Sequence, residues 1–286
     1  MQRSSNAHLL NACPPLVKSA LQEDILKRPS DDKIRIAYDL ADCLHINDRR
    51  KGFQELPYIT HPVRVYDLVK RCTTEHTPDR EVMLAAALLH DTIEDHSPKD
   101  DNEVRRKSTI RKEVAEQIRN AFSSDPKFAE KVVDLVEELT NPEEFLDENG
   151  KTITKEAWQV AHAKNSSLAA RVVKVCDQTA NMISDIEELP NLPSDKIIAY
   201  REKAKKVVAA CYKNLPPEAE EHFSLNFAVR FFEVVCNICE TYLGKTVKLT
   251  NGEAYHAARL RMEEIDQAIR HALEQGGRER KSDRGL

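Results

Sequence analysis

The chain has 286 residues, 32% of them charged and 41% hydrophobic, and its formal net charge at pH 7 is −5. This composition is typical of a water-soluble globular protein with one large domain or two small ones, and a net negative chain has no general attraction for nucleic acid. No apolar run approaches the roughly 18 residues of a membrane span, and the first ten residues lack the apolar core of a secretory signal. The seven cysteines are scattered and odd in number, which favours reduced thiols in a cytoplasmic protein.

Residues 1–30 are expected to form an arm, in which one short helix lies between two proline-containing stretches. Ser30-Asp31-Asp32 offers N-cap chemistry for the next helix, whose apolar side chains recur at helical spacing from Ile34 to Leu44. That helix is followed by three cations, Arg49, Arg50 and Lys51. A triplet of this kind is usually a solvated helix end, so a functional role for it needs support from other parts of the chain.

Another helix is expected to begin near Pro62, a residue suited to the first helical turn, and His61 stands directly before it. A lone histidine in this position is usually structural. A strongly helix-forming run follows at residues 83–95. Its first half is apolar, and its second half carries four polar side chains, His90, Asp91, Glu94 and Asp95.

Helical geometry groups these polar side chains. Residues four apart share a helix face, so His90 would lie beside Glu94 and Asp91 beside Asp95. His90 and Asp91 would be about 100° apart, near enough to reach one cation. A buried apolar helix would carry the carboxylates into a cleft, which is costly unless a metal or a cationic ligand neutralises them. The pattern therefore predicts a metal site.

The middle of the chain adds one more candidate ligand. Residues 96–111 are dense in charge and are predicted to form a mobile loop near the mouth of the site. A helix expected around residues 172–183 carries Asp177 beside an apolar stripe, with Asn181 one turn later. A carboxylate in so apolar a run needs a partner, which a metal would provide.

Beyond residue 211 the chain changes character. Pro216-Pro217 marks a break, after which an apolar helix is expected from Phe223 to Leu243 and a last helix from Ala257 to Leu273. Cys236 and Cys239 have CxxC spacing but no partner pair, and they are interpreted as buried thiols.

The order His, His-Asp, Asp, with an adjacent Glu-Asp pair, resembles the HD phosphohydrolase superfamily from about residue 32 to residue 210. The likeness is stronger to the hydrolase domains of RelA/SpoT-type alarmone enzymes and to small stand-alone alarmone hydrolases. It is carried by Arg50-Lys51 and residues 57–62, 86–95, 135–140, 173–181 and 200–208. The chain departs from the pattern around Lys155, which has fewer basic neighbours, and at Cys176 and Gln178.

The resemblance implies an all-α fold, an HD-domain helical bundle with a C-terminal helical extension. We expect an N-terminal arm at residues 1–30, the hydrolase domain at 31–212, the helical extension at 213–275 and a disordered tail at 276–286. The tail region is too short for the synthetase domain of bifunctional family members.

The resemblance also implies roles for individual residues. The implied metal ligands are His61, His90, Asp91 and Asp177, and the implied catalytic pair is Glu94 and Asp95. The implied substrate contacts are Arg50, Lys51, Tyr58, Asn181, Lys196 and Tyr200. Mixed nitrogen and oxygen ligation suits Mn²⁺, which the family favours, while Fe²⁺ and Zn²⁺ accept the same ligands.

The implied activity is hydrolysis of the 3′-pyrophosphate of guanosine tetraphosphate or pentaphosphate, the alarmones of the stringent response, to give GDP or GTP and pyrophosphate. Two alternatives stay open: an HD enzyme for another nucleotide, such as an adenosine alarmone or a nucleoside phosphate, and a noncatalytic alarmone-binding regulator. We expect a cytoplasmic location, no membrane or nucleic-acid partner, and the C-terminal helices as a candidate surface for homo-oligomers.

Overall fold

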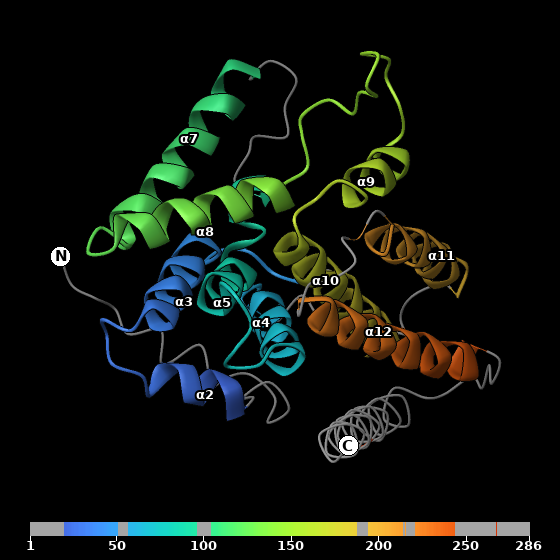
Figure 1. Ribbon diagram of the computed structural model, residues 1–286, viewed down its shortest axis with the longest axis horizontal. Coiled ribbons are helices and arrows are strands. Elements are labelled where there is room, and N and C mark those ends of the chain that lie inside the picture. Colours follow the sequence, from blue (N-terminus) through green and yellow to red (C-terminus); the bar gives the residue numbers. More distant parts are fainter. Residues whose placement is uncertain are drawn as a thin grey trace, which may run out of the picture.

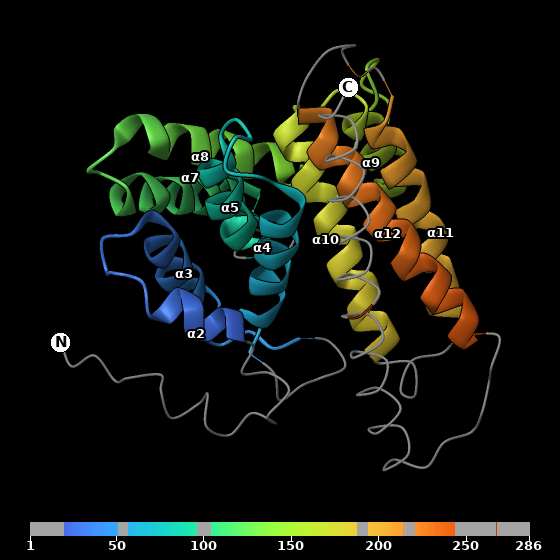
Figure 2. The same ribbon diagram turned by 60° about the horizontal axis from the view of Figure 1, so that its bottom comes forward.

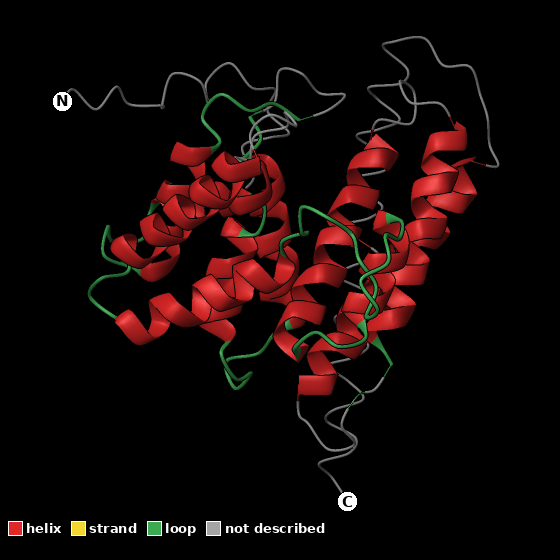
Figure 3. Cartoon of the chain, turned by 90° about the horizontal axis from the view of Figure 1, so that it is seen from above, coloured by secondary structure: helices red, strands yellow, loops and turns green. Residues whose placement is uncertain are grey.

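The computed structural model describes residues 20–50, 57–95, 104–187, 194–213, 215, 221–243 and 267. Throughout these ranges the regular elements are helices, joined by turns and loops (Figure 3). The two β-bridges found there, Arg49 with Pro57 and Leu146 with Thr152, are isolated and form no sheet. The all-α prediction is therefore confirmed for the described residues. No helix in these ranges is long and apolar enough to cross a membrane.

The helices follow one another with short connections. The first group comprises α2 (Ala20–Leu26), α3 (Lys33–Leu44), α4 (Thr60–Cys72), α5 (Arg80–Leu89), α6 (Thr92–Asp95), α7 (Val104–Ala121) and α8 (Pro126–Leu139). The second comprises α9 (Lys155–Ala163), α10 (Leu168–Glu187), α11 (Ser194–Cys211) and α12 (Glu221–Leu243).

Several helices begin where the sequence supplies a capping side chain. Asp32 accepts hydrogen bonds from the backbone N–H of Ile34 and Arg35 at 2.9 and 3.3 Å, which starts α3 as predicted. Asp125 caps α8, and the hydroxyl of Thr154 caps α9. Each such cap typically contributes about 1 kcal/mol to helix stability.

Helix α5 lies at the centre of the N-terminal half. Its residues from Val82 to Leu89 are all buried, as expected of a helix that is apolar on every side. It packs against α3, α4 and α8, and α10 lies against both α4 and α5. Figure 1 shows α3, α4 and α5 on one side of α10, with α11 and α12 on its other side.

Helix α10 joins the two halves. Its most extensive contact is with α12, and it also packs against α4 and α11 (Figure 2). At its N-terminal end the buried Arg171 donates hydrogen bonds to four backbone carbonyls, those of Lys164, Ser166, Cys211 and Lys213, at 2.8–3.1 Å. One guanidinium thus ties the ends of α9 and α11 to the start of α10.

The loop prediction for residues 96–111 is wrong in its second half. Residues 104–111 form the first two turns of α7, and Arg111 donates a 2.9 Å hydrogen bond to the carbonyl of Asn141. The cause is the apolar stripe farther along the same helix, where Val114 and Ile118 are buried. It stabilises a charge-rich segment that contains no glycine or proline.

The predicted helix at residues 83–95 is interrupted. Helix α5 ends at Leu89 and α6 begins at Thr92. The ring Nδ1 of His90 donates to the carbonyl of Ala87 at 2.9 Å, and the hydroxyl of Thr92 donates to the carbonyl of Leu89 at 2.6 Å. These local side-chain bonds compete with the helical ladder. The expectation that His90 and Glu94 share one continuous helix face is therefore wrong.

At the two ends of the chain the predictions are only partly covered. Ile25 of α2 is fully buried, so this part of the expected arm packs into the core against α3 and α4. The apolar helix expected from Phe223 to Leu243 is confirmed as α12. Cys236 and Cys239 are free, buried thiols, as interpreted. The helix predicted at 257–273 and the tail at 276–286 lie outside the described residues, and the proposed domain boundaries stay predictions.

Candidate active site

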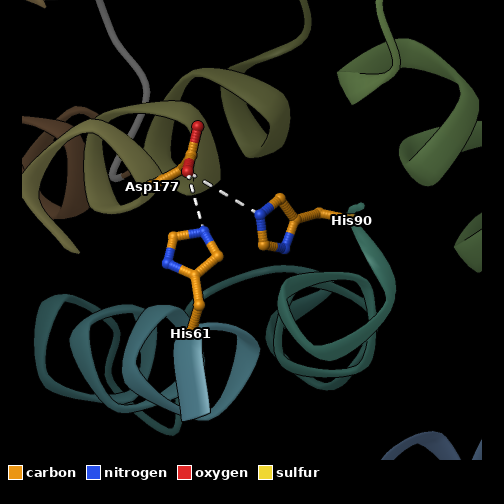
Figure 4. A group of neighbouring side chains, drawn as sticks. All are labelled: His61, His90 and Asp177. Carbon is orange, nitrogen blue, oxygen red and sulfur yellow. Dashed lines mark ion pairs between the residues drawn. The ribbon is translucent and has the colours of Figure 1, made fainter. Parts of the chain in front are cut away.

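Three side chains that are far apart in the sequence meet at one point (Figure 4). His61 comes from the first turn of α4, His90 from the end of α5, and Asp177 from the middle of α10. Asp177 Oδ1 lies 3.3 Å from His61 Nε2 and 3.7 Å from His90 Nε2. All three side chains are buried, and their potential ligand atoms lie within 4.8 Å of one another.

The tautomer of His90 fits metal binding. A backbone carbonyl only accepts hydrogen bonds, so the 2.9 Å contact with Ala87 places a proton on Nδ1. The other nitrogen, Nε2, is buried and makes no hydrogen bond of acceptable geometry, although Asp91 Oδ2 lies 3.1 Å away. A lone pair facing carboxylate oxygens is unfavourable unless a cation lies between them. The three side chains therefore form a site for a divalent metal ion.

The protonation of the cluster supports this conclusion. Burial lowers the pKa of His61 to about 4, so its ring is a neutral ligand at pH 7. Burial alone would raise the pKa of Asp177, but Lys174 and the two imidazoles hold it well below its usual value. For His90, burial alone would lower the pKa, but Asp91 and Asp177 raise it well above the usual value. The two carboxylates thus require a positive charge between them, which a proton on His90 or a metal ion supplies.

Asp91, the other predicted ligand, borders this cluster. Its Oδ2 lies 3.1 Å from His90 Nε2 and 3.6 Å from His61 Nε2, and it accepts a 2.7 Å hydrogen bond from the hydroxyl of Tyr58. Burial alone would raise the pKa of Asp91, but His90 lowers it below its usual range. Tyr58, expected as a substrate contact, therefore orients this carboxylate.

The break between α5 and α6 turns Glu94 toward α9. Its carboxylate accepts a 2.6 Å hydrogen bond from the Asn141 amide and lies 3.1 Å from Lys155 Nζ. Asn141 accepts in turn from Gln159 at 3.0 Å. The sequence analysis missed Asn141 and Gln159, whose amide side chains carry no distinctive motif. Asp95 ends α6, and its side chain lies outside the described residues.

A cleft of approximately 670 Å³ opens beside the cluster. Its wall includes His61, Asp91, Glu94 and Asp177, and of the predicted substrate contacts it includes Arg50, Tyr58, Asn181, Lys196 and Tyr200. Lys51 lies outside the described residues. The structure thus places nearly all of the described candidate residues on one cavity.

Hydrogen bonds connect the metal cluster to the far end of the cleft. The Asn181 amide donates to Asp177 Oδ1 at 2.8 Å, and its oxygen lies 3.5 Å from the Arg50 guanidinium. Arg50 also donates to the Ser184 hydroxyl at 3.1 Å. The Tyr200 hydroxyl donates to Gln178 Oε1 at 3.2 Å. The far end therefore presents a planar cation, an aromatic ring and an amide.

Three lysines that the sequence analysis did not assign also line the cleft. They are Lys155 of α9, Lys174 of α10 and Lys203 of α11. Burial lowers the pKa of Lys203, and the charges of Lys155 and Lys174 lower it further. Helical spacing is the signal that would have found two of them, because Lys174 precedes Asp177 by three residues and Lys203 follows Tyr200 by three.

Comparison with known proteins identifies the segment that holds this site. Residues 58–182 match the family described as HD domain. The human guanosine-3′,5′-bis(diphosphate) 3′-pyrophosphohydrolase MESH1 is 32% identical over 146 residues, which are 51% of this chain and 65% of that protein. Its Drosophila melanogaster counterpart is 29% identical over 140 residues, 48% of this chain and 61% of that protein.

Two further matches have different extents. The bifunctional (p)ppGpp synthase/hydrolase RelA of Mycobacterium tuberculosis is 35% identical over 94 residues, 33% of this chain and 11% of that protein. A solved structure, described as a metazoan ortholog of SpoT that hydrolyses ppGpp, is 25% identical with a TM-score of 0.47, covering 71% of this chain and 97% of that one. The chain spans just under two thirds of the length of the MESH1 relatives. Residues 58–182, which carry His61, His90 and Asp177, are an HD domain, and the chain resembles RelA/SpoT-type hydrolases and their stand-alone relatives.

Proposed function

We propose that this protein is a metal-dependent phosphohydrolase that removes the 3′-pyrophosphate of guanosine tetraphosphate or pentaphosphate, leaving GDP or GTP. The observation that carries the proposal is the buried His61, His90 and Asp177 cluster on a cleft with several basic side chains. Relatives named for the same 3′-pyrophosphohydrolase activity support it. A cytoplasmic location, a role in the stringent response and self-association through residues 213–275 belong to the same proposal.

The metal would be held by His61, His90 and Asp177, with Asp91 as a fourth ligand. Two imidazoles and two carboxylates suit Mn²⁺, and Fe²⁺ or Zn²⁺ accept the same donors. When bound, such an ion lowers the pKa of a coordinated water towards ~7 and polarises the phosphorus centre.

The chain's own groups would perform the remaining tasks. Glu94 would take a proton from the attacking water, because its carboxylate lies on the cleft and is fixed by Asn141 and Lys155. Asp95, the next residue, would orient that water. The cations of the cleft wall would hold the phosphates while negative charge develops on the leaving pyrophosphate; they are Arg50, Lys51, Lys155, Lys174 and Lys196. Asn181 and Tyr200 would bind the nucleoside, and Tyr58 would keep Asp91 in place.

The fixed position of Glu94 favours an enzyme over a noncatalytic regulator. Binding alone does not require a carboxylate held beside the metal cluster, and an unpaired negative charge would repel the phosphates of the ligand. The two hydrogen-bonded partners of Glu94 therefore favour turnover.

The proposal is tested by incubating the Mn²⁺-loaded protein with a panel of nucleotides and separating the products by chromatography. The panel contains the 3′,5′-bis(diphosphates) of guanosine and adenosine, and GDP and ADP as matched nucleotides with a free 3′-hydroxyl. We expect GDP and pyrophosphate from the guanosine substrate and no reaction of the 3′-hydroxyl nucleotides. Absence of pyrophosphate release from both bis(diphosphates) would refute the proposal, and hydrolysis of GDP or ADP would reassign the reaction to the 5′ side.

A further inference from the structure

Asp185 is a second acidic residue on the cleft, at the end away from the metal cluster. It follows Asp177 and Asn181 on α10 at successive intervals of four residues, and all three line the cleft. Eight residues of α-helix correspond to a rise of about 12 Å. This span is comparable with the reach of one nucleotide from its 3′-phosphate to the outer edge of its base.

The Asp185 carboxylate has no hydrogen bond or ion pair with any residue in the described part of the chain. Arg50 is the positive charge that influences it, but that guanidinium donates to Ser184 and lies against Asn181. Burial raises the pKa of Asp185 to about 6 in spite of Arg50, so the group is mostly ionised at neutral pH. A carboxylate removed from water is costly unless donors reach it. In this cleft a ligand is positioned to supply them.

The neighbours of Asp185 suit a planar ring. Arg50 offers a planar guanidinium, and Tyr200 offers an aromatic side chain whose pKa responds to burial and to Asp177, Asp185 and Arg50. Guanidinium groups and aromatic rings both stack on flat π-systems. A base held there would present its edge to Asp185.

We propose that Asp185 determines the base specificity of the cleft by accepting hydrogen bonds from N1–H and the N2 amino group of guanine. The proposal rests on the function proposed above and names the residue that reads the base. An ionised carboxylate only accepts hydrogen bonds, and guanine offers two adjacent donors on this edge. Hypoxanthine offers one donor. Adenine places the acceptor N1 beside its amino group, so its lone pair would face the carboxylate.

The test compares the 3′,5′-bis(diphosphates) of guanosine, inosine and adenosine as substrates of the Mn²⁺-loaded protein. For the wild type we expect kcat/KM to fall in that order, with guanosine preferred over adenosine by about 10- to 100-fold. Because Asp185 lies away from the metal cluster, the preference should appear mainly in KM. In Asp185→Ala the three substrates should differ by only a few fold, and kcat for the adenosine substrate should be kept.

Asp134→Asn is the matched control, because Asp134 is exposed on α8 and does not line the cleft. It removes the same charge and should leave the substrate order unchanged. Equilibrium binding of GDP, IDP and ADP to the same proteins measures the preference without turnover. Release of pyrophosphate with an identical substrate order in wild type and Asp185→Ala would overturn the role of Asp185 and leave the hydrolase function standing. Absence of release from all three would refute the function, and equal binding of GDP and ADP by the wild type would refute the base preference independently.

Discussion

At the scale of single residues, the two acidic side chains of α10 that face the cleft differ in protonation. The pKa of Asp177 lies well below its usual value because Lys174 and two imidazoles outweigh its burial. The pKa of Asp185 is raised to about 6 because burial outweighs the more distant Arg50. The first environment produces a permanent anion suited to a metal. The second stores an unfavourable charge that a ligand relieves.

Asp185→Asn should therefore stabilise the folded protein at alkaline pH. The folded-state pKa is raised from 3.8, so the contribution of Asp185 to stability is fully present below pH 3.8 and is lost as the pH rises through about 6. Asparagine has no charge to bury, so the variant should gain about 1–3 kcal/mol at pH 8 and less at pH 5. Urea unfolding of both proteins at the two pH values measures this, and an equal gain at both would contradict the assignment.

Asp177→Ala should lose bound metal together with activity. Asp177 Oδ1 is the oxygen that lies between the two ring nitrogens, so its removal leaves His61 and His90 without the carboxylate they share. Elemental analysis after dialysis against Mn²⁺ provides the measurement, with Asp134→Asn as a variant that keeps the metal. Full metal content in Asp177→Ala would remove this residue from the ligand set.

Glu94→Gln should separate catalysis from metal binding. Glu94 hydrogen bonds with Asn141 and Lys155, and it is absent from the group of converging ligand atoms. The amide cannot take a proton, so turnover should fall by roughly 10²–10⁴-fold while metal content and KM stay near the wild-type values. Near-normal turnover would instead assign proton transfer to Asp95.

The sequence predicted the residues of the site better than their partners. His61, His90, Asp91 and Asp177 could be found because their side-chain types are rare in apolar surroundings and occur in a fixed order. Asn141 could not, because a single amide in a loop carries no pattern until the fold brings it to Glu94. Asp185 was missed for a related reason, since only the cleft shows that its carboxylate has lost water.

At the scale of helices, the interruption between α5 and α6 shows a limit of periodicity. The stretch from Met83 to Asp95 has helix-forming residues throughout, so spacing alone predicts one helix. The local bonds of His90 and Thr92 to preceding carbonyls end α5 and redirect the chain. The consequence is functional, because Glu94 then reaches Asn141 and Lys155 of other segments.

Arg171→Met should destabilise the fold more than the loss of a surface arginine. Arg171 is buried and donates to four backbone carbonyls at the junction of α9, α10 and α11. A methionine leaves those carbonyls without these donors, so we expect a loss of about 3–5 kcal/mol in the free energy of unfolding. Arg119→Met, which breaks a half-exposed pair with Glu130, should cost no more than about 1 kcal/mol. Similar losses for both variants in urea would contradict the structural role of Arg171.

At the scale of the whole molecule, the cleft depends on contacts between distant segments. The helical class could be predicted from the sequence because glycine is rare and apolar side chains recur at helical spacing. The packing of α12 on α10 could not, since local periodicity states which face is apolar and not which helix covers it. Assignment of residues 104–111 to a loop failed for a similar reason, because their stabilising stripe begins farther along α7.

The charge of the molecule is distributed so that the cleft differs from the rest. The chain carries a net charge of −5, yet Arg50, Lys155, Lys174, Lys196 and Lys203 all line one cavity. A concave wall of like charges raises the local concentration of an oppositely charged substrate, and added salt screens this attraction. A highly charged nucleotide should therefore bind with a strong salt dependence despite the negative net charge of the protein.

Lys203→Met tests this distribution of charge against a matched control on the same helix. Lys203 is half-buried on the cleft, and the charges of Lys155 and Lys174 lower its pKa further below what burial alone would give. An anionic ligand would relieve that repulsion, so removing Lys203 should raise KM for the guanosine bis(diphosphate) by about 10-fold and flatten the dependence of KM on salt. Lys206→Met, three residues later, removes an exposed lysine paired with Glu156 and should change KM little. Steady-state kinetics from low to high ionic strength decide the matter. Equal effects of the two substitutions would mean that the net charge of the protein, rather than the cleft, controls substrate attraction.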